Sequence, residues 1–274
     1  MTARTWLGGG NNLASNPLDW SPNGAPHAGD TLTVQGTSAY TVNIQGNALA
    51  GDTLTVTDQN TTINLSNNAV AAIRTFYDPV INIAGTVHMS LDDENSQDTV
   101  NLAANAHWVG GFNVIYQTGI TVNGGPGASF INNMNSQFGS SACGTFTVPV
   151  AGTGSMSATH FSTLEFKASV GSGQTIAVQS STVKVDDPHA YAALTHLQGE
   201  GSIDLVGLTG NTSYALVGKY LELFHGNTVT WAAPFKIDPA ASYGQGLEVV
   251  QAAGGVSIYQ SGDPHAGLPL YHYV

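Results

Sequence analysis

Ala28-Gly-Asp-Thr-Leu-Thr-Val34 and Ala50-Gly-Asp-Thr-Leu-Thr-Val56 are the same seven residues, and the second copy begins 22 positions after the first. Each copy starts with a Gly-Asp turn and continues with alternating polar and apolar residues, as a strand with one buried face does. A turn-plus-strand unit that recurs at this period is typical of a solenoid, in which each coil buries its apolar edge on its neighbours. The repeat therefore predicts an all-β chain, folded as a right-handed parallel β-solenoid of about 12 coils or fewer.

Apolar residues two positions apart continue the strand pattern beyond the repeat, and turn residues separate nearly all of these pairs. Examples are Val42/Ile44, Ile63/Leu65, Val100/Leu102, Ile120/Val122 and Ile203/Leu205. No long stretch has a clean helical period, although Asn68–Tyr77 and His189–Leu197 are each expected to form a short helix or a loop at a corner. We expect one elongated domain, in which residues 1–66 cap and begin the solenoid, 67–158 form irregular middle coils with loops, and 159–274 form C-terminal coils and a tail.

The composition is acidic overall but poor in charge. The net charge is −12, with 18 acidic and six basic residues, and charged residues make up 9% of the chain, compared with about a quarter in ordinary globular domains. Six scattered cations cannot form the basic stripe that nucleic-acid binding needs. Neutral Asn, Thr and Ser side chains must cover the surface instead, and in stacked strands they can form ladders from coil to coil.

Cysteine and hydropathy patterns limit the fold further. Cys143 is the single cysteine, so an internal disulfide cannot form and the fold must depend on packing and hydrogen bonds. No apolar run reaches the roughly 18 residues of a membrane span. The first residues lead directly into patterned sequence without a leader, so export is expected to use a removed leader or another signal.

Two segments carry a resemblance to a known family. The first is Trp6-Leu-Gly-Gly-Gly, continued by Asn16-Pro-Leu-Asp-Trp20-Ser-Pro-Asn-Gly-Ala-Pro26-His-Ala-Gly-Asp30. The second runs from Gly173 to about Ile258 and includes a "DP" turn, LQGEGSIDLVGL, KYLELFHGNTV and GLEVVQAAGGVSI. Together they resemble bacterial secreted β-helix proteins of the autotransporter-passenger and large surface-protein kind.

The resemblance implies an architecture and a location rather than a reaction. It points to a β-helix at the bacterial surface or outside the cell, where such modules occur in adhesins, in matrix proteins and beside glycan-cleaving domains. The chain lacks both an obvious membrane-anchoring barrel and calcium-binding nonapeptides of the RTX type. The family supplies no catalytic residues, so none is assigned here.

One acidic cluster is a candidate metal site. Asp92, Asp93, Glu94 and Asp98 could hold Ca²⁺ through clustered carboxylate oxygens, although their spacing matches no EF-hand. The alternative is a solvated loop between two strands. No cofactor is required by any other motif, and calcium is the one ion that the sequence suggests.

Aromatic residues near turns and strand ends are candidate contacts for a glycan or a partner, because exposed aromatic rings stack on sugar rings. The candidates are Trp108, Tyr116, Trp231, Tyr271 and Tyr273. Trp6 and Trp20 are instead expected to cap the open end of the solenoid core. Thr-x-Thr pairs such as Thr31/Thr33 and Thr53/Thr55 are too sparse for ice binding, which demands a flat array in register on every coil.

The leading hypothesis is a non-enzymatic extracellular structural or adhesive protein of a bacterial surface layer, fibre or biofilm matrix, which binds a cell surface or neutral glycans through polar ladders and aromatic loops. Exposed solenoid ends also allow stacking of copies head to tail, with the apolar tail Gly267–Val274 as one contact. The alternative is a glycoside hydrolase or lyase with an acidic groove on the solenoid flank. That activity needs two facing carboxylates roughly 5–10 Å apart, in a concave, aromatic-lined cleft.

Overall fold

The computed structural model describes residues 2–36, 38–58, 60–171 and 173–185, and beyond these the backbone of strand residues 197–205, 213–214, 229–231, 236–237, 243–244, 247–252, 255–260 and 271–273. Side chains are described through position 184, except at 178–180. Within this part of the chain there is no helix of the length and apolarity that crossing a membrane requires.

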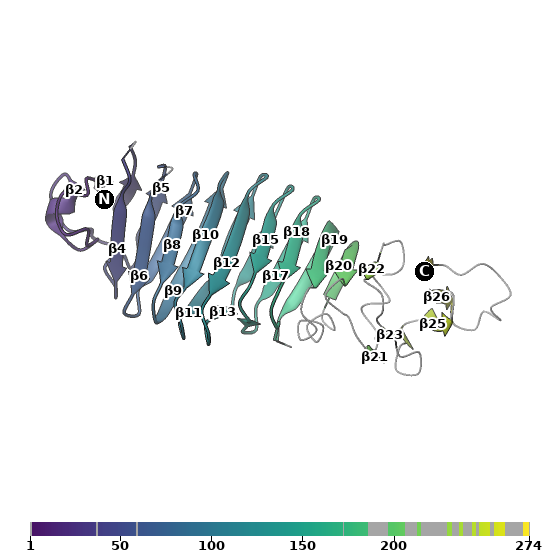
Figure 1. The fold of residues 1–274 in the computed structure, drawn as a ribbon. Coiled ribbons are helices and arrows are strands. Elements are labelled where there is room, and N and C mark those ends of the chain that lie inside the picture. Colours follow the sequence, from purple (N-terminus) through teal and green to yellow (C-terminus); the bar gives the residue numbers. More distant parts are fainter. Residues whose placement is uncertain are drawn as a thin grey trace.

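The chain winds into stacked parallel coils, a β-solenoid of about seven turns (Figure 1). The first face of the solenoid consists of β3 (Thr31–Val34), β5 (Thr53–Val56), β7 (Val70–Thr75), β9 (Thr86–Glu94), β11 (His107–Ile115), β14 (Asn135–Phe138), β17 (Ser155–Thr159) and the beginning of β19 (Thr175–Val185). The second face consists of β4 (Thr41–Gln45), β6 (Thr62–Ser66), β8 (Val80–Ile83), β10 (Gln97–Leu102), β12 (Gly119–Gly124), β15 (Cys143–Phe146), β18 (Thr163–Phe166) and the end of β19. The solenoid class predicted from the repeat is confirmed.

Shorter strands complete the structure. A third row begins on the first residues of β9 and β11 and continues through β13 (Ser129–Asn132) and β16 (Val150–Ala151). The strands after β19 are β20 (Leu197–Leu205), β21 (Ser213–Tyr214), β22 (Val229–Trp231), β23 (Lys236–Ile237), β24 (Tyr243–Gly244), β25 (Leu247–Ala252), β26 (Gly255–Gln260) and β27 (Tyr271–Tyr273). β20 extends both main faces, because it pairs in parallel with β19 along its length. β24 to β27 pair antiparallel with one another.

The two copies of the repeat lie one coil apart in exact register with each other. Leu32 is paired with Leu54 and Val34 with Val56, and all four side chains are fully buried. The threonines between them point outward, as the alternation requires. The sequence repeat is therefore the structural repeat.

The Gly-Asp turn of each copy connects one coil to the one before it. The Asp52 carboxylate accepts hydrogen bonds from the backbone N–H groups of Gly29 (2.6 Å) and Asp30 (3.1 Å). The Asp30 carboxylate accepts in turn from the Thr2 N–H (2.7 Å) and the Arg4 guanidinium (2.7 Å). The bond from Arg4, followed by that from Thr2, lowers the pKa of Asp30 to about 2.

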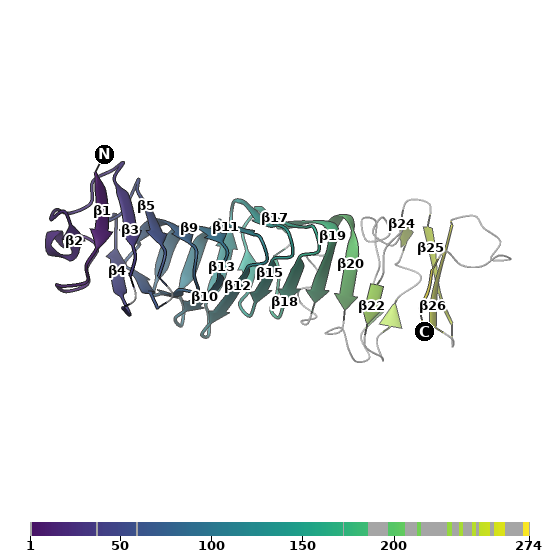
Figure 2. The same ribbon diagram turned by 90° about the horizontal axis from the view of Figure 1, so that it is seen from above.

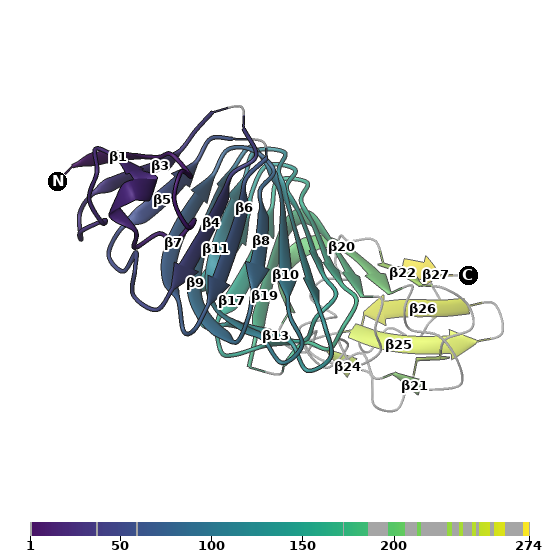
Figure 3. The same ribbon diagram turned by 60° about the vertical axis from the view of Figure 1, so that its left-hand side comes forward.

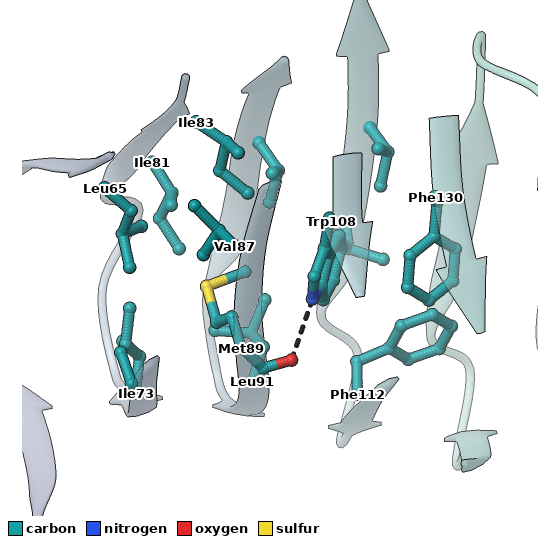
Figure 4. Packing of buried hydrophobic residues seen from close by; sticks show 14 of the residues in the cluster. Leu65, Ile73, Ile81, Ile83, Val87, Met89, Leu91, Trp108, Phe112 and Phe130 are labelled. Carbon is teal, nitrogen blue, oxygen red and sulfur yellow. Dashed lines mark hydrogen bonds between the residues drawn. The ribbon is translucent and has the colours of Figure 1, made fainter. Parts of the chain in front are cut away.

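The core changes character along the solenoid. Leu, Ile and Val fill the first coils, and aromatic side chains take over from β11 onward (Figure 4). Phe146 lies at the centre of the aromatic part, because its ring stacks between those of Phe130 (centroids 5.8 Å apart) and Phe166 (5.7 Å). The column of rings is continuous, so these coils share one core.

One element differs from what the sequence indicates. Asn68–Tyr77 contains strand β7 rather than a helix, because Ile73 is buried and pairs with both Leu54 and Leu91. Tertiary pairing thus overrides the helical preference of the alanines. Strand pairing continues from β6 to β8 and from β17 to β19, at the two boundaries expected between the regions of the chain.

The N-terminal end of the solenoid is capped, as predicted for the two tryptophans. β1 (Ala3–Trp6) pairs with β3 on one side and with β2 (Trp20–Ser21) on the other, after the short helix η1 (Pro17–Asp19) (Figures 2 and 3). The buried rings of Trp6 and Trp20 pack edge to face with centroids 5.0 Å apart. Backbone hydrogen bonds between residues 12–14 and Asn43 cover the edge of β4 as well. Both edges of the first coil are therefore protected from pairing with another chain.

Candidate functional site

The outward side of the second face, whose strands lie side by side in Figure 1, carries two rows of uncharged residues across six successive coils, and all of these residues except Val80 are polar. The first row contains Thr41, Thr62, Val80, Thr99, Thr121 and Thr145. The second row contains Asn43, Asn64, Asn82, Asn101, Asn123 and Thr147. We call these twelve residues the Thr/Asn face.

The asparagines of this face form a continuous hydrogen-bonded ladder. The side-chain amide of each asparagine donates to the amide oxygen of the one before it, at 2.8 Å (Asn64 to Asn43), 2.9 Å (Asn82 to Asn64), 3.2 Å (Asn101 to Asn82) and 3.4 Å (Asn123 to Asn101). The Thr147 hydroxyl extends the ladder with a 3.4 Å contact to the Asn123 amide oxygen. These contacts fix the side chains while leaving donors and acceptors free toward solvent. The polar ladder expected from the composition is therefore present.

The Thr/Asn face is notable for its lack of charge. None of its twelve residues is ionisable, although the chain carries 24 Asp, Glu, Lys and Arg residues, 18 acidic and six basic. The next coil ends the pattern, because Glu165 follows Thr145 in register and Lys167 lies beside it. The charge-free face is thus bounded by the cap at one end and by an ion pair at the other.

Replacing Asn82 by aspartate tests the ladder directly. The carboxylate keeps the acceptor for Asn101 but loses the donor to Asn64, whose amide oxygen it then faces. We expect Asn82→Asp to lower the free energy of unfolding by about 1 kcal/mol near neutral pH, measured by urea denaturation. Asn47→Asp, in an exposed turn, is the matched control and is expected to change stability by less than about 0.5 kcal/mol. An equal loss in both variants would mean that the ladder contributes nothing.

The four candidate metal ligands do not converge on one site. Asp92 and Glu94 are on the outward side of β9, where both pair with Arg74. Asp93 points inward and meets Asp98 from β10 in the corner between the two faces. Alternation along a strand sends neighbours to opposite sides, so consecutive acids could not all bind one ion.

The inward pair forms a closed network with two hydroxyl groups. Ser96 Oγ lies 2.6 Å from the carboxylate of Asp93 and 2.7 Å from that of Asp98, and the Thr75 hydroxyl lies 2.7 Å from Asp98. These three short contacts each need a proton, but the two hydroxyls supply only two. A carboxyl proton completes the network, so at least one acid of the pair is neutral.

The electrostatics of the corner agree with this proton count. Burial raises the pKa of Asp93 to about 8, and the negative charge of Asp98 adds to the shift. Burial likewise raises the pKa of Asp98 to about 7, against the hydrogen bonds from Thr75 and Ser96. Both carboxyls are almost completely shielded from solvent.

The corner offers few ligands for an ion. Asp93 Oδ2 has no hydrogen-bond partner, but the described part of the chain contains no group of three or more His, Cys, Asp or Glu side chains placed to hold a metal. Ca²⁺ takes about six to eight oxygen ligands, whereas the carboxyl and hydroxyl groups of this corner are hydrogen-bonded to one another. Calcium binding stays a prediction from the sequence that these residues do not by themselves support.

The aromatic candidates fall into three groups. Trp108 was expected at the surface, and this expectation is wrong, because its side chain is fully buried and its indole N–H donates to the Met89 carbonyl at 2.8 Å (Figure 4). Tyr116 is 66% exposed at a corner, so it is available for contact. Trp231, Tyr271 and Tyr273 lie in strands whose side chains are outside the described residues.

A groove of about 610 Å³ lies on the flank of the solenoid, over β5, β7, β9 and β11. Its lining includes Val70, Ala72, His88, Ser90 and Met134, and Asp52 is the single acid in it. Asp52 already accepts two backbone hydrogen bonds. The carboxyl pair with raised pKa lies inside the core instead, so this groove does not combine the features that the enzyme alternative needs.

Sequence reasoning missed the Thr/Asn face, although a signal for it exists. Thr-x-Asn occurs at Thr41/Asn43, Thr62/Asn64, Thr99/Asn101 and Thr121/Asn123, and in these four copies the middle residue is an inward-pointing Val or Ile. A search for Thr-x-Thr pairs passes over this motif.

No protein-family model, curated protein or solved structure matches the chain.

Proposed function

We propose that this protein is an extracellular structural or adhesive β-solenoid of a bacterial surface layer, fibre or biofilm matrix, and that it binds neutral polar surfaces through the Thr/Asn face. The observation that carries the proposal is the charge-free, hydrogen-bonding face of six coils on a chain with a net charge of −12. We expect a functional surface where the distribution of charge differs most from that of the rest of the molecule.

The geometry of the face suits adhesion. Thr hydroxyls and Asn amides each donate and accept hydrogen bonds, which neutral glycans and other uncharged polar surfaces also do. The ladder already holds the asparagine side chains, so binding would order few additional rotamers and lose little entropy. Single contacts of this kind are weak, and repetition over six coils multiplies them.

Self-association is the second part of the proposal, and the cap limits how it could occur. Trp6, Trp20 and the segment before η1 cover both edges of the first coil. A contact that adds strands at this end would have to displace the cap. Association of copies is therefore expected through other surfaces, including the C-terminal tail predicted from the sequence.

The enzyme alternative has less support from the described geometry. Glycoside hydrolysis needs two accessible carboxylates facing the substrate. The flank groove contributes one, Asp52, and the pair with raised pKa is enclosed in the core. Adhesion therefore accounts for more of the described surface than catalysis does.

Adsorption to insoluble polysaccharide tests the proposal. The full-length chain is incubated with cellulose and chitin particles, and the bound fraction is measured after sedimentation. We expect saturable binding, and we expect Thr99→Lys to weaken it at least about tenfold, because a hydrated cation is then fixed in the middle of the face.

The matched control is Gln137→Lys, which adds the same charge at an outward strand position on the first face. It is expected to bind as the unchanged protein does. Absence of adsorption to either particle would rule out polysaccharide as the bound surface, and equal loss in the two lysine variants would rule out the Thr/Asn face as the surface that adsorbs. Circular dichroism of both variants verifies that the solenoid is intact.

A further inference from the structure

We infer that the surface that the Thr/Asn face binds is ice. The inference rests on the proposed adhesive role of this face and names its ligand. It starts from the register of the strands, which places the two rows on successive coils without a slip from Thr41 to Thr145. The face thus repeats from coil to coil, and each coil presents a pair of positions at the same separation.

The repeat along the rows and the separation between the two rows both follow from strand geometry. Neighbouring coils are about 4.7–4.9 Å apart, and side chains two positions apart on a strand are about 6.6–6.8 Å apart. A lattice can match the repeat along the rows and the separation between them at the same time. Hexagonal ice presents oxygen repeats close to these two spacings on its prism faces.

The chemistry of the face matches water in its ordered form. Every residue except Val80 brings a hydroxyl or an amide, which can occupy the place of a donor or an acceptor in the lattice. Each threonine also carries a methyl group, and Val80 adds apolar surface to the same row, which restricts the orientation of first-shell water. Charged groups hold their hydration water in orientations that disagree with the lattice, and the face has none.

The face is also rigid enough for lattice matching. The chain of amide hydrogen bonds from Asn43 to Asn123 fixes the second row at the spacing of the coils. The threonines of the first row are β-branched and have restricted χ1 angles. A preordered array loses little entropy when it meets a solid surface.

The absence of aromatic side chains from the twelve residues separates ice from a crystalline polysaccharide. Sugar rings are bound largely by stacking on aromatic rings, and the largest apolar side chain in this face is Val80. The exposed Tyr116 lies at a corner, outside the two rows. The sequence argument against ice counted Thr-x-Thr pairs, whereas in the structure asparagine occupies the second row.

Two measurements on the full-length chain test the inference. The first is partition of the protein into a slowly grown ice shell, and the second is the gap between the melting and freezing temperatures of a single ice crystal. We expect incorporation into ice and a measurable gap. Thr121→Tyr places a bulky ring in the array and is expected to reduce both at least about tenfold.

Ser157→Tyr is the matched control, because Ser157 is an outward strand residue on the first face. We expect it to behave as the unchanged protein, and Thr99→Tyr to behave as Thr121→Tyr. Exclusion of the unchanged protein from ice, or an equal effect of all three tyrosine variants, would overturn the inference.

Comparison with the particle assay separates this inference from the adhesive proposal. Binding to cellulose or chitin through the Thr/Asn face without binding to ice would refute the inference and keep the adhesive role. Failure in both assays would refute both. Binding to ice without adsorption to polysaccharide would support the inference and restrict adhesion to ice.

Discussion

Raising the pH from 5 to 8 is expected to destabilise the folded protein, because the Asp93–Asp98 pair must lose protons inside the core. The folded pKa values of about 8 and 7 lie above the ordinary aspartate value of 3.8. The stability from the protonated pair is therefore complete below pH 3.8 and is lost as the pH rises through 7 and 8. The slope is on the order of 1.4 kcal/mol per pH unit for each proton bound only by the folded state.

The Arg4–Asp30 ion pair gives the opposite dependence at low pH. Its folded pKa of about 2 lies below 3.8, so its contribution is present above that value and is lost as the pH falls to 2. The two dependences meet at the ordinary aspartate value of 3.8, so we expect the maximum of stability near this pH. Urea midpoints measured from pH 3 to pH 9 locate it.

An Asp93→Asn/Asp98→Asn double variant isolates the contribution of the core pair to the pH dependence. Asparagine keeps the size of the side chain and cannot ionise. The double variant is expected to lose most of the decline between pH 5 and 8. An unchanged profile in the variant, or a wild-type stability that does not fall over this range, would show that the pair does not control the pH dependence.

Replacing Phe146 by alanine is expected to lower the free energy of unfolding by about 3–5 kcal/mol, the range for a fully buried aromatic side chain. The Phe146 ring lies within 5.7–6.4 Å of those of Phe112, Phe130, Phe138 and Phe166, measured between centroids. Its removal would open a cavity that four rings border. Urea denaturation followed by circular dichroism measures the loss.

Phe161→Ala removes the same atoms from the surface and is the control. Phe161 is 80% exposed, so its truncation is expected to change the free energy of unfolding by less than about 0.5 kcal/mol. Similar losses in the two variants would mean that the aromatic column is not the stabilising centre of these coils.

The sequence predicts the solenoid well where the repeat is explicit. It is less informative where the pairing with neighbouring strands determines the secondary structure. The AGDTLTV copies predicted the coil and its period, and their register in the structure is the one implied. In Asn68–Tyr77 the local preference is mixed, and β7 forms because β5 and β9 lie on either side of it. Such neighbours cannot be known before the coils are aligned.

The position of Trp108 depends on a local bend that the sequence does not specify. The following Gly110 has a φ of +152°, and a Cβ there would lie 1.9 Å from the Met89 carbonyl oxygen. This glycine lets β11 continue from the third row into the first face while both Trp108 and Phe112 remain inside. In the sequence, the glycines that follow Trp108 suggest a loop at the surface. In the structure, Gly110 instead allows β11 to bend and continue as one long strand.

The Thr/Asn face was hidden because the coils differ in length. Successive threonine-row positions are separated by 18 residues between Thr62 and Val80 and by 24 between Thr121 and Thr145. Loops of varying length interrupt the sequence period but leave the strand register unchanged. The two rows can be recognised only once the strands are paired. In the linear sequence the same residues are scattered polar positions.

The asparagine ladder also makes the surface subject to a slow chemical change. Asparagine amides hydrolyse spontaneously to carboxylates, and the reaction is fastest where glycine follows, since the next backbone nitrogen can then attack the amide without hindrance. Four ladder asparagines precede Ile or Leu, whereas Asn123 precedes Gly124 and makes the longest amide contact, at 3.4 Å. Ageing is therefore expected to begin at this position and to introduce the first negative charge into an otherwise neutral array. The charge at Asn123 would therefore increase with the age of the protein.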